Sequence, residues 1–210
     1  QVDVLNRQMI EMCGMIENTL EDASEVLQSL DKKRAEEIIE GDSVIDRKER
    51  EIESLCLRML LTRQPVAHDL RVVSSALKMI TDMERIADHA ADISEIITMI
   101  DYEIKQRPEH FLAMSRTAID MVHRAVDAYV RQDVELARVV MDDDDIVDAL
   151  FVEVKQEIAS YMAKDSSRSI EGMDFLMIAK YYERIGDHAV NIAEWVEYCV
   201  TGLYKGDELR

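Results

Sequence analysis

The chain has 210 residues, 48% of them hydrophobic, which is enough to bury a sizeable core. It carries 25 basic and 44 acidic residues, and this formal net charge of −19 argues against binding to nucleic acid or to anionic lipid. Six glycines, two prolines and 5% aromatic residues leave little turn chemistry for a β fold. The composition therefore predicts an all-α protein whose natural partners are cations and basic protein surfaces.

In the first half of the chain, apolar residues recur at alternating spacings of three and four, which predicts three long amphipathic helices. The second helix follows residues 30–37 and ends near Pro65, which cannot continue a helix. The third runs from about Asp69 to about Asp101. The residues predicted on the three apolar stripes are Leu5, Met9, Met12, Ile16, Ala23 and Leu30; Ala35, Ile38, Ile45, Ile52, Cys56 and Met59; and Leu70, Val73, Leu77, Ile80 and Ala91.

Pro108 interrupts the middle of the chain, and beyond it the same pattern restarts. Matching positions are Ile16 and Ile119, Ile45 and Val147, Ile52 and Val154, Leu77 and Leu176, and Glu84 and Glu183. The sequence therefore predicts two copies of a three-helix unit, residues 1–105 and 106–210. Short turns between helices near thirty residues long indicate six antiparallel helices in an elongated, pseudo-symmetric bundle.

Carboxylates interrupt the stripes at repeated places. Asp42 and Asp46 lie one turn apart on the second helix, and Glu84 and Asp88 lie one turn apart on the third. The equivalent residues of the second half are Asp144, Asp148, Glu183 and Asp187. If neighbouring helices are antiparallel, four carboxylates converge in each half.

Each unscreened carboxylate pair at about 5 Å would repel by roughly 3 kcal/mol at an effective dielectric near 20. Such a cluster must protonate, recruit Arg or Lys, or bind a cation. Oxygen ligands suit hard cations such as Mg, Mn, Ca or ferric iron, and several carboxylates can bridge more than one ion. The competing interpretation is a solvated acidic face on which Arg85 and Arg184 form weak surface ion pairs.

Three further residues are candidate additional ligands: Glu49, His89 and His188. Each histidine directly follows a predicted ligand, and the next residue on a helix points about 100° away, so packing is the favoured role. Phe151 stands at the position equivalent to Glu49, so a ligand there would belong to the first half alone.

The three cysteines, Cys13, Cys56 and Cys199, are far apart and form no Cys-x-x-Cys pair. Cys56 falls on an apolar stripe, where we expect a small buried hydrophobe. The sequence shows no signal-peptide pattern and no apolar run near the ~20 residues that span a bilayer. These features predict a cytoplasmic protein without direct membrane insertion.

The phrases "ERIADHAADI" (84–93), "ERIGDHAVNI" (183–192) and "QPVAHDLR" (64–71) resemble the PhoU family of phosphate-uptake regulators. The resemblance implies a cytoplasmic, often dimeric negative regulator of phosphate uptake and phosphate-starvation signalling, not an enzyme. It implies contacts with the ATPase of the phosphate ABC transporter and with the sensor histidine kinase. It also implies that the eight repeated carboxylates hold metal ions in multinuclear clusters, with iron expected first and zinc, magnesium or manganese as alternatives.

Two other functions fit parts of the pattern. A metal-free acidic helical adaptor would use the same faces to bind basic partners. A carboxylate-bridged di-iron oxidase would need Glu-x-x-His on two helices, and the sequence contains no such motif. Nucleophilic triads, glycine-rich phosphate loops and zinc-type cysteine pairs are absent as well.

Overall fold

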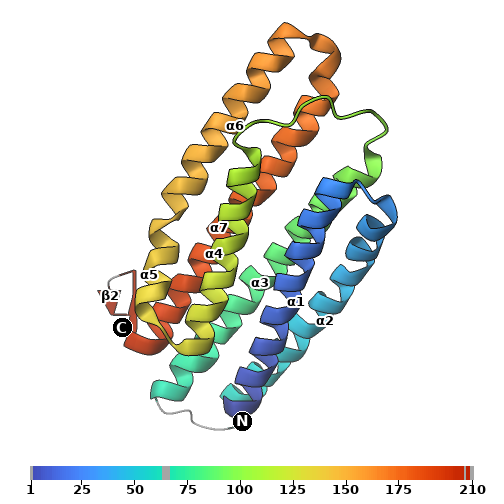
Figure 1. Ribbon diagram of the computed structural model, residues 1–210. Coiled ribbons are helices and arrows are strands. Elements are labelled where there is room, and N and C mark those ends of the chain that lie inside the picture. Colours follow the sequence, from blue (N-terminus) through green and yellow to red (C-terminus); the bar gives the residue numbers. More distant parts are fainter. Residues whose placement is uncertain (1, 63–66, 206, 209–210) are drawn as a thin grey trace.

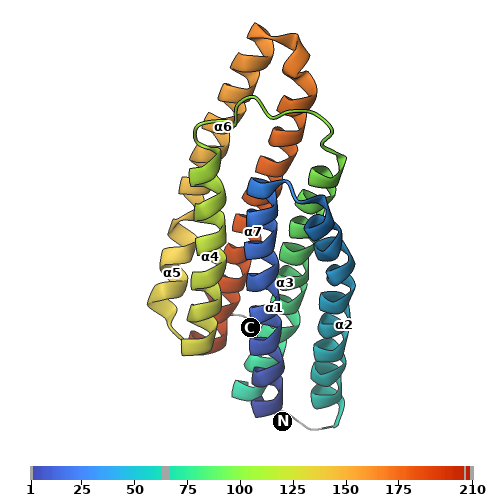
Figure 2. The ribbon, with the colours of Figure 1, turned by 45° about the vertical axis from the view of Figure 1, so that its right-hand side comes forward.

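The computed structural model describes residues 2–62, 67–205 and 207–208. Two groups of helices lie side by side (Figures 1 and 2). The first group contains α1 (Val2–Ser29), α2 (Lys32–Thr62) and α3 (Ala67–Met99). The second contains α4 (Phe111–Arg131), α5 (Val134–Asp142), α6 (Asp144–Lys164) and α7 (Ser169–Thr201), with the 3-10 turn η1 (Ser166–Arg168) and the short strands β1 (Leu203–Tyr204) and β2 (Asp207–Glu208). The predicted all-α class is confirmed.

The core runs along the bundle between the predicted stripes. Every residue predicted on the stripe of the second helix is buried, Cys56 included. On the third helix the prediction was wrong for Leu70, which is 47% exposed because it lies in the first turn of α3, near the end of the bundle. Leu30, Leu77 and Ala91 are only partly buried. The predicted helix end at Pro65 lies outside the described residues.

Aspartates mark several helix boundaries. Asp31 accepts hydrogen bonds from the backbone N–H groups of Lys33 and Arg34, and Asp133 accepts one from Leu136, as expected of N-cap residues. The fifth of the six long helical segments is divided into α5 and α6 at Asp143. The break falls within four consecutive aspartates, 142–145, and aspartate has a low helix propensity.

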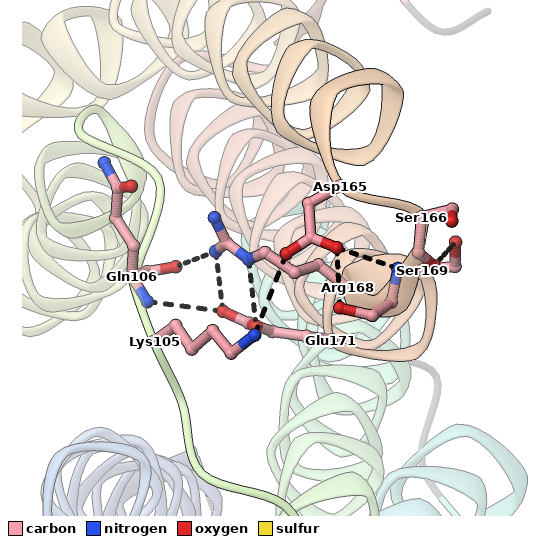
Figure 3. Close-up of polar contacts among 8 residues, drawn as sticks. Lys105, Gln106, Asp165, Ser166, Arg168, Ser169 and Glu171 are labelled. Atoms are coloured by element: carbon pink, nitrogen blue, oxygen red, sulfur yellow. Dashed lines mark hydrogen bonds and ion pairs between the residues drawn. The ribbon is translucent and has the colours of Figure 1, made fainter.

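The segment between the two groups, residues 100–110, crosses the bundle and is tied down at both sides. Arg107 donates a hydrogen bond to the carbonyl oxygen of Leu27, near the end of α1. At the other side Arg168 donates to the carbonyl oxygen of Gln106 and forms a buried ion pair of 2.9 Å with Glu171 (Figure 3). The hydrogen bond from Arg168 to Gln106, and one from the backbone N–H of Gln106 to Glu171, join this segment to the start of α7.

The pair formed by α6 and the first part of α7 projects beyond the connecting segment in both views (Figures 1 and 2). Its two helices meet closely, because a Cβ atom at Gly172 would lie only 2.5 Å from Sδ of Met162. None of the helices in the described part has the length and apolar character needed to span a bilayer.

Gly186 gives a stability prediction, because its counterpart 99 residues earlier is Ala87. A Cβ atom at Gly186 would make ordinary contacts, 3.6 Å from Val147. Gly186→Ala should therefore stabilise the protein by about 0.5–1 kcal/mol, since alanine loses less backbone entropy in a helix. Urea unfolding measures the gain. Gly172→Ala is the control and should gain less or lose stability, because Met162 must move; equal gains at both sites would contradict this account.

Candidate metal centre

The acidic residues of the first half converge where α2 packs against α3. One carboxylate oxygen each from Asp42, Asp46 and Asp88 lie within 4.8 Å of one another. Asp42 and Asp46 come from α2 and Asp88 from α3, so the antiparallel packing brings together residues more than forty positions apart. The sequence pattern predicted that four carboxylates would converge here; three of them lie within this distance, and Glu84 is not in the group.

Burial and mutual repulsion disfavour the charged forms of this set. Burial, followed by the charges of Asp88 and Asp46, raises the pKa of Asp42 to about 6. One oxygen of Asp42, Oδ1, is buried and has no hydrogen-bond partner among the described residues. Burial and the charge of Asp88 raise the pKa of Glu84 to about 7, and burial likewise raises the pKa of Glu49.

Arginines neutralise part of this charge. Nη1 of Arg85 lies 2.7 Å from Asp88, and Nη2 of Arg50 lies 3.2 Å from Asp46. Both arginine side chains are more than half exposed, so these ion pairs contribute little. A metal ion fits the site better, because it would satisfy the buried oxygen of Asp42 and because carboxylate oxygens are the ligands that hard cations prefer.

The second half has a looser version of the same set. Burial, followed by Asp187 and Asp148, raises the pKa of Asp144 to about 6, and burial and Glu183 raise the pKa of Asp187. Within the described ranges, the acidic group with three ligand atoms inside 4.8 Å is the one in the first half. Lys180 forms an ion pair of 2.5 Å with Glu183, whereas the equivalent residue of the first half is Thr81.

His89 and His188, the two histidines predicted as additional ligands, lie where α3 packs against α7. Their rings are 5.6 Å apart. Nδ1 of His89 lies 3.3 Å from Asp92, and Nδ1 of His188 lies 2.8 Å from Asp82, whose oxygen also accepts a hydrogen bond from Asn191. Burial lowers the pKa of His89. Each histidine already has a carboxylate partner, so its position is explained by contacts between α3 and α7 without a metal ion. A role of either histidine as a metal ligand stays a prediction.

The sequence patterns did not identify Asp82 and Tyr181 as site residues. Asp82 lies beside His188, and Tyr181 lies beside His89. The Tyr181 ring lies 5.4 Å from that of His89. Asp82 and Tyr181 are equivalent positions of the two repeats, 99 residues apart. The difference between the repeats at this position was the feature of the sequence that could have identified them. A cleft of about 680 Å³ opens here, and Arg85, Arg184, Asp144 and Asp187 are among its lining residues.

Comparisons with known proteins agree with the geometry. The family model described as the PhoU domain matches residues 9–97 and 111–196. The "Phosphate-specific transport system accessory protein PhoU homolog" of Clostridium acetobutylicum is 34% identical over 203 residues, which cover 96% of this chain and 93% of the relative. The "Phosphate-specific transport system accessory protein PhoU" of Escherichia coli is 32% identical over an alignment of 217 positions, covering 100% of this chain and 89% of the relative.

Two solved structures share the fold. The crystal structure of PhoU from Pseudomonas aeruginosa has a TM-score of 0.92 and 32% identity, and it covers 96% of this chain and 97% of that one. The crystal structure of the phosphate transport system regulatory protein PhoU from Streptococcus pneumoniae has a TM-score of 0.89 and 27% identity, with 97% and 99% covered. The architecture therefore extends over nearly the whole of both chains.

The raised pKa of Glu84 predicts a pH-dependent stability for the metal-free protein. The folded state binds the Glu84 proton more tightly than the unfolded chain, so this residue costs stability above pH 7 and the cost vanishes as pH falls to about 4.5. Glu84→Gln should therefore raise the free energy of unfolding at pH 8, by about 1 kcal/mol after allowing for solvent screening, and change little at pH 4.5.

Urea unfolding in the presence of a chelator at both pH values measures this difference. The control is Glu36→Gln, because Glu36 is an exposed glutamate of α2. A gain for Glu84→Gln that is the same at pH 4.5 and pH 8 would contradict the electrostatic explanation.

Proposed function

This chain belongs to the PhoU family, and on that premise we propose that it is a cytoplasmic negative regulator of phosphate uptake and of phosphate-starvation signalling. The observation that supports this function best is the partly buried carboxylate set of α2 and α3, with its counterpart on α6 and α7. Relatives that align over the whole chain are named accessory proteins of phosphate-specific transport. The regulator acts by binding and not by catalysis.

The carboxylate sets are proposed to hold metal ions, one site or cluster in each half. The ligands are Asp42, Asp46, Glu84 and Asp88 in the first half and Asp144, Asp148, Glu183 and Asp187 in the second. The oxygen donors favour hard cations such as ferric iron, magnesium or manganese. The family resemblance is the reason for placing iron first and for keeping zinc as a further alternative. A bound cation would remove the repulsion between carboxylates and tie α2 to α3 and α6 to α7.

The proposed partners are the ATPase of the phosphate ABC transporter and the sensor histidine kinase, and we expect the protein to be a homodimer. The printed names of the relatives support the association with phosphate transport. The net charge of −19 supports docking onto basic protein surfaces, because opposite charges steer association and suppress wrong partners.

A metal-free acidic adaptor is the second candidate. It is favoured by the ion pairs that Arg50, Arg85 and Lys180 already form with the proposed ligands. In that case side-chain cations, and not metal, would compensate the carboxylates. Metal content of the purified protein separates the two candidates.

The metal hypothesis predicts two unequal sites. Asp88→Asn should lower metal content more than Asp187→Asn, because the first set is tighter, and the double variant should bind less than either. Each site should stabilise the folded protein by about 2.7 kcal/mol when the metal is at a hundredfold excess over the Kd of that site. Elemental analysis and melting with and without chelator measure both effects, with the exposed Glu36→Gln as control. Unchanged metal content in the double variant would refute the assignment.

The regulatory hypothesis predicts that deleting the gene leaves phosphate-starvation genes active when phosphate is abundant. Replacing Glu84, Asp88, Glu183 and Asp187 together by their amides should reproduce part of this defect without unfolding the protein. Reporter expression, and binding to the transporter ATPase and the sensor kinase, are the measurements. A folded quadruple variant that bound both partners and repressed normally would exclude a role of the metal sites in signalling.

A further inference from the structure

The outer face of α7 carries exposed apolar residues in its projecting part. Ile170, Met173 and Met177 are 62%, 52% and 46% exposed. Their spacing of three and four places them on one side of the helix, opposite the buried residues Phe175 and Ile178. Three large apolar side chains in a row on the solvent face cannot be explained by the core.

The neighbouring face of α6 continues this surface. Phe151 is half-buried, with Nζ of Lys155 5.7 Å and Nζ of Lys180 5.3 Å from its ring centre. Farther along α6, Met162 packs over Gly172. We name Phe151, Lys155, Met162, Ile170, Met173 and Met177 together the hairpin strip.

The first half provides an internal control for this surface. The positions equivalent to the hairpin strip are Glu49, Glu53, Leu60, Arg71, Ser74 and Lys78. The two halves share the same buried pattern, so the fold alone permits charged and polar residues here. Five of these six positions are polar or charged in the first half, and in the second half they carry an apolar residue or, at one position, a lysine in place of a glutamate. This difference points to a function of the second half alone.

Contacts at the turn between α6 and α7 fix the position of the hairpin strip, and the described ends of the chain lie far from it. Arg168 stacks over the Tyr161 ring at 4.0 Å and pairs with Glu171, which fixes the tip between α6 and α7 (Figure 3). The start of α1 and strand β1 lie at the opposite end of the molecule (Figures 1 and 2). Neither described end of the chain can cover the strip.

We propose that the hairpin strip is the docking site for an amphipathic helix of a partner protein whose apolar face is bordered by Asp and Glu. Methionines adapt their shape to a partner helix, as such sites require. Lys155, within the strip, is exposed, and so is Arg184, which lies two turns beyond Met177 on the same side of α7. Both supply positive charge on a protein whose net charge of −19 repels acidic segments elsewhere. The inference rests on the proposed function only in requiring a partner protein.

The test places a photo-crosslinking amino acid at Met173 of the full chain in its native cells, with the equivalent position Ser74 as control. The crosslinked peptides are sequenced. A segment with apolar residues at helical spacing, bordered by Asp or Glu and captured at Met173 but not at Ser74, would support the proposal. Capture of a second copy of this chain, of lipid or of a basic segment, or no capture at all, would overturn it.

A synthetic peptide of the captured segment then allows binding to be measured directly. Met177→Glu and Lys155→Glu should each weaken binding at least tenfold, while Lys78→Glu in the first half should not. All three positions lie on the solvent side, so melting curves should stay unchanged. Unchanged affinity in both strip variants would overturn the inference. Starvation-gene reporters in the same strains report separately on the proposed function, which survives if repression is normal while the strip fails.

Discussion

The antiparallel packing of α3 against α7 is the contact on which the rest of the structure depends. His89 of α3 meets Tyr181 and His188 of α7, and Asp82 reaches His188 and Asn191. This packing fixes the two repeats around a pseudo-twofold relation, so that α2 and α6 take equivalent places beside the central pair. Each carboxylate set draws its ligands from one central and one outer helix of the same half, so the pseudo-twofold relation places the two sets at equivalent positions.

Two replacements between the repeats distinguish the halves. Where the first half has Glu49 and Thr81, the second has Phe151 and Lys180. Lys180 pairs with Glu183 and also lies over the Phe151 ring, so the same pair of residues loosens the second carboxylate set and begins the apolar surface beside it. Duplication therefore gave one half a tighter cluster of oxygen ligands and the other a surface suited to an apolar partner.

Much of this structure could be predicted from the sequence, because the helices and their buried faces follow from local periodicity. The convergence of Asp42, Asp46 and Asp88 was also predictable, since antiparallel neighbours bring interrupted stripes together. The helix break at Asp143 could not be predicted in this way, because the spacing of apolar residues shows which face of a helix is buried and not where the helix is interrupted. Asp82 and Tyr181 were missed because their partners lie about a hundred residues away, and no local pattern marks a contact across the pseudo-symmetry.

The asymmetric hydrogen bonds between α3 and α7 also decide which halves can pair with each other. Two similar halves in one chain could pair like with like between separate molecules. A first half paired with another first half would set Asp82 against Asp92, the residue equivalent to Asn191, and the two carboxylates would repel. Two second halves would offer Asn191 and His188 only a tyrosine in place of the aspartate. Pairing of a first half with a second half satisfies these groups, so the polar residues of this interface favour unlike over like pairing of the halves.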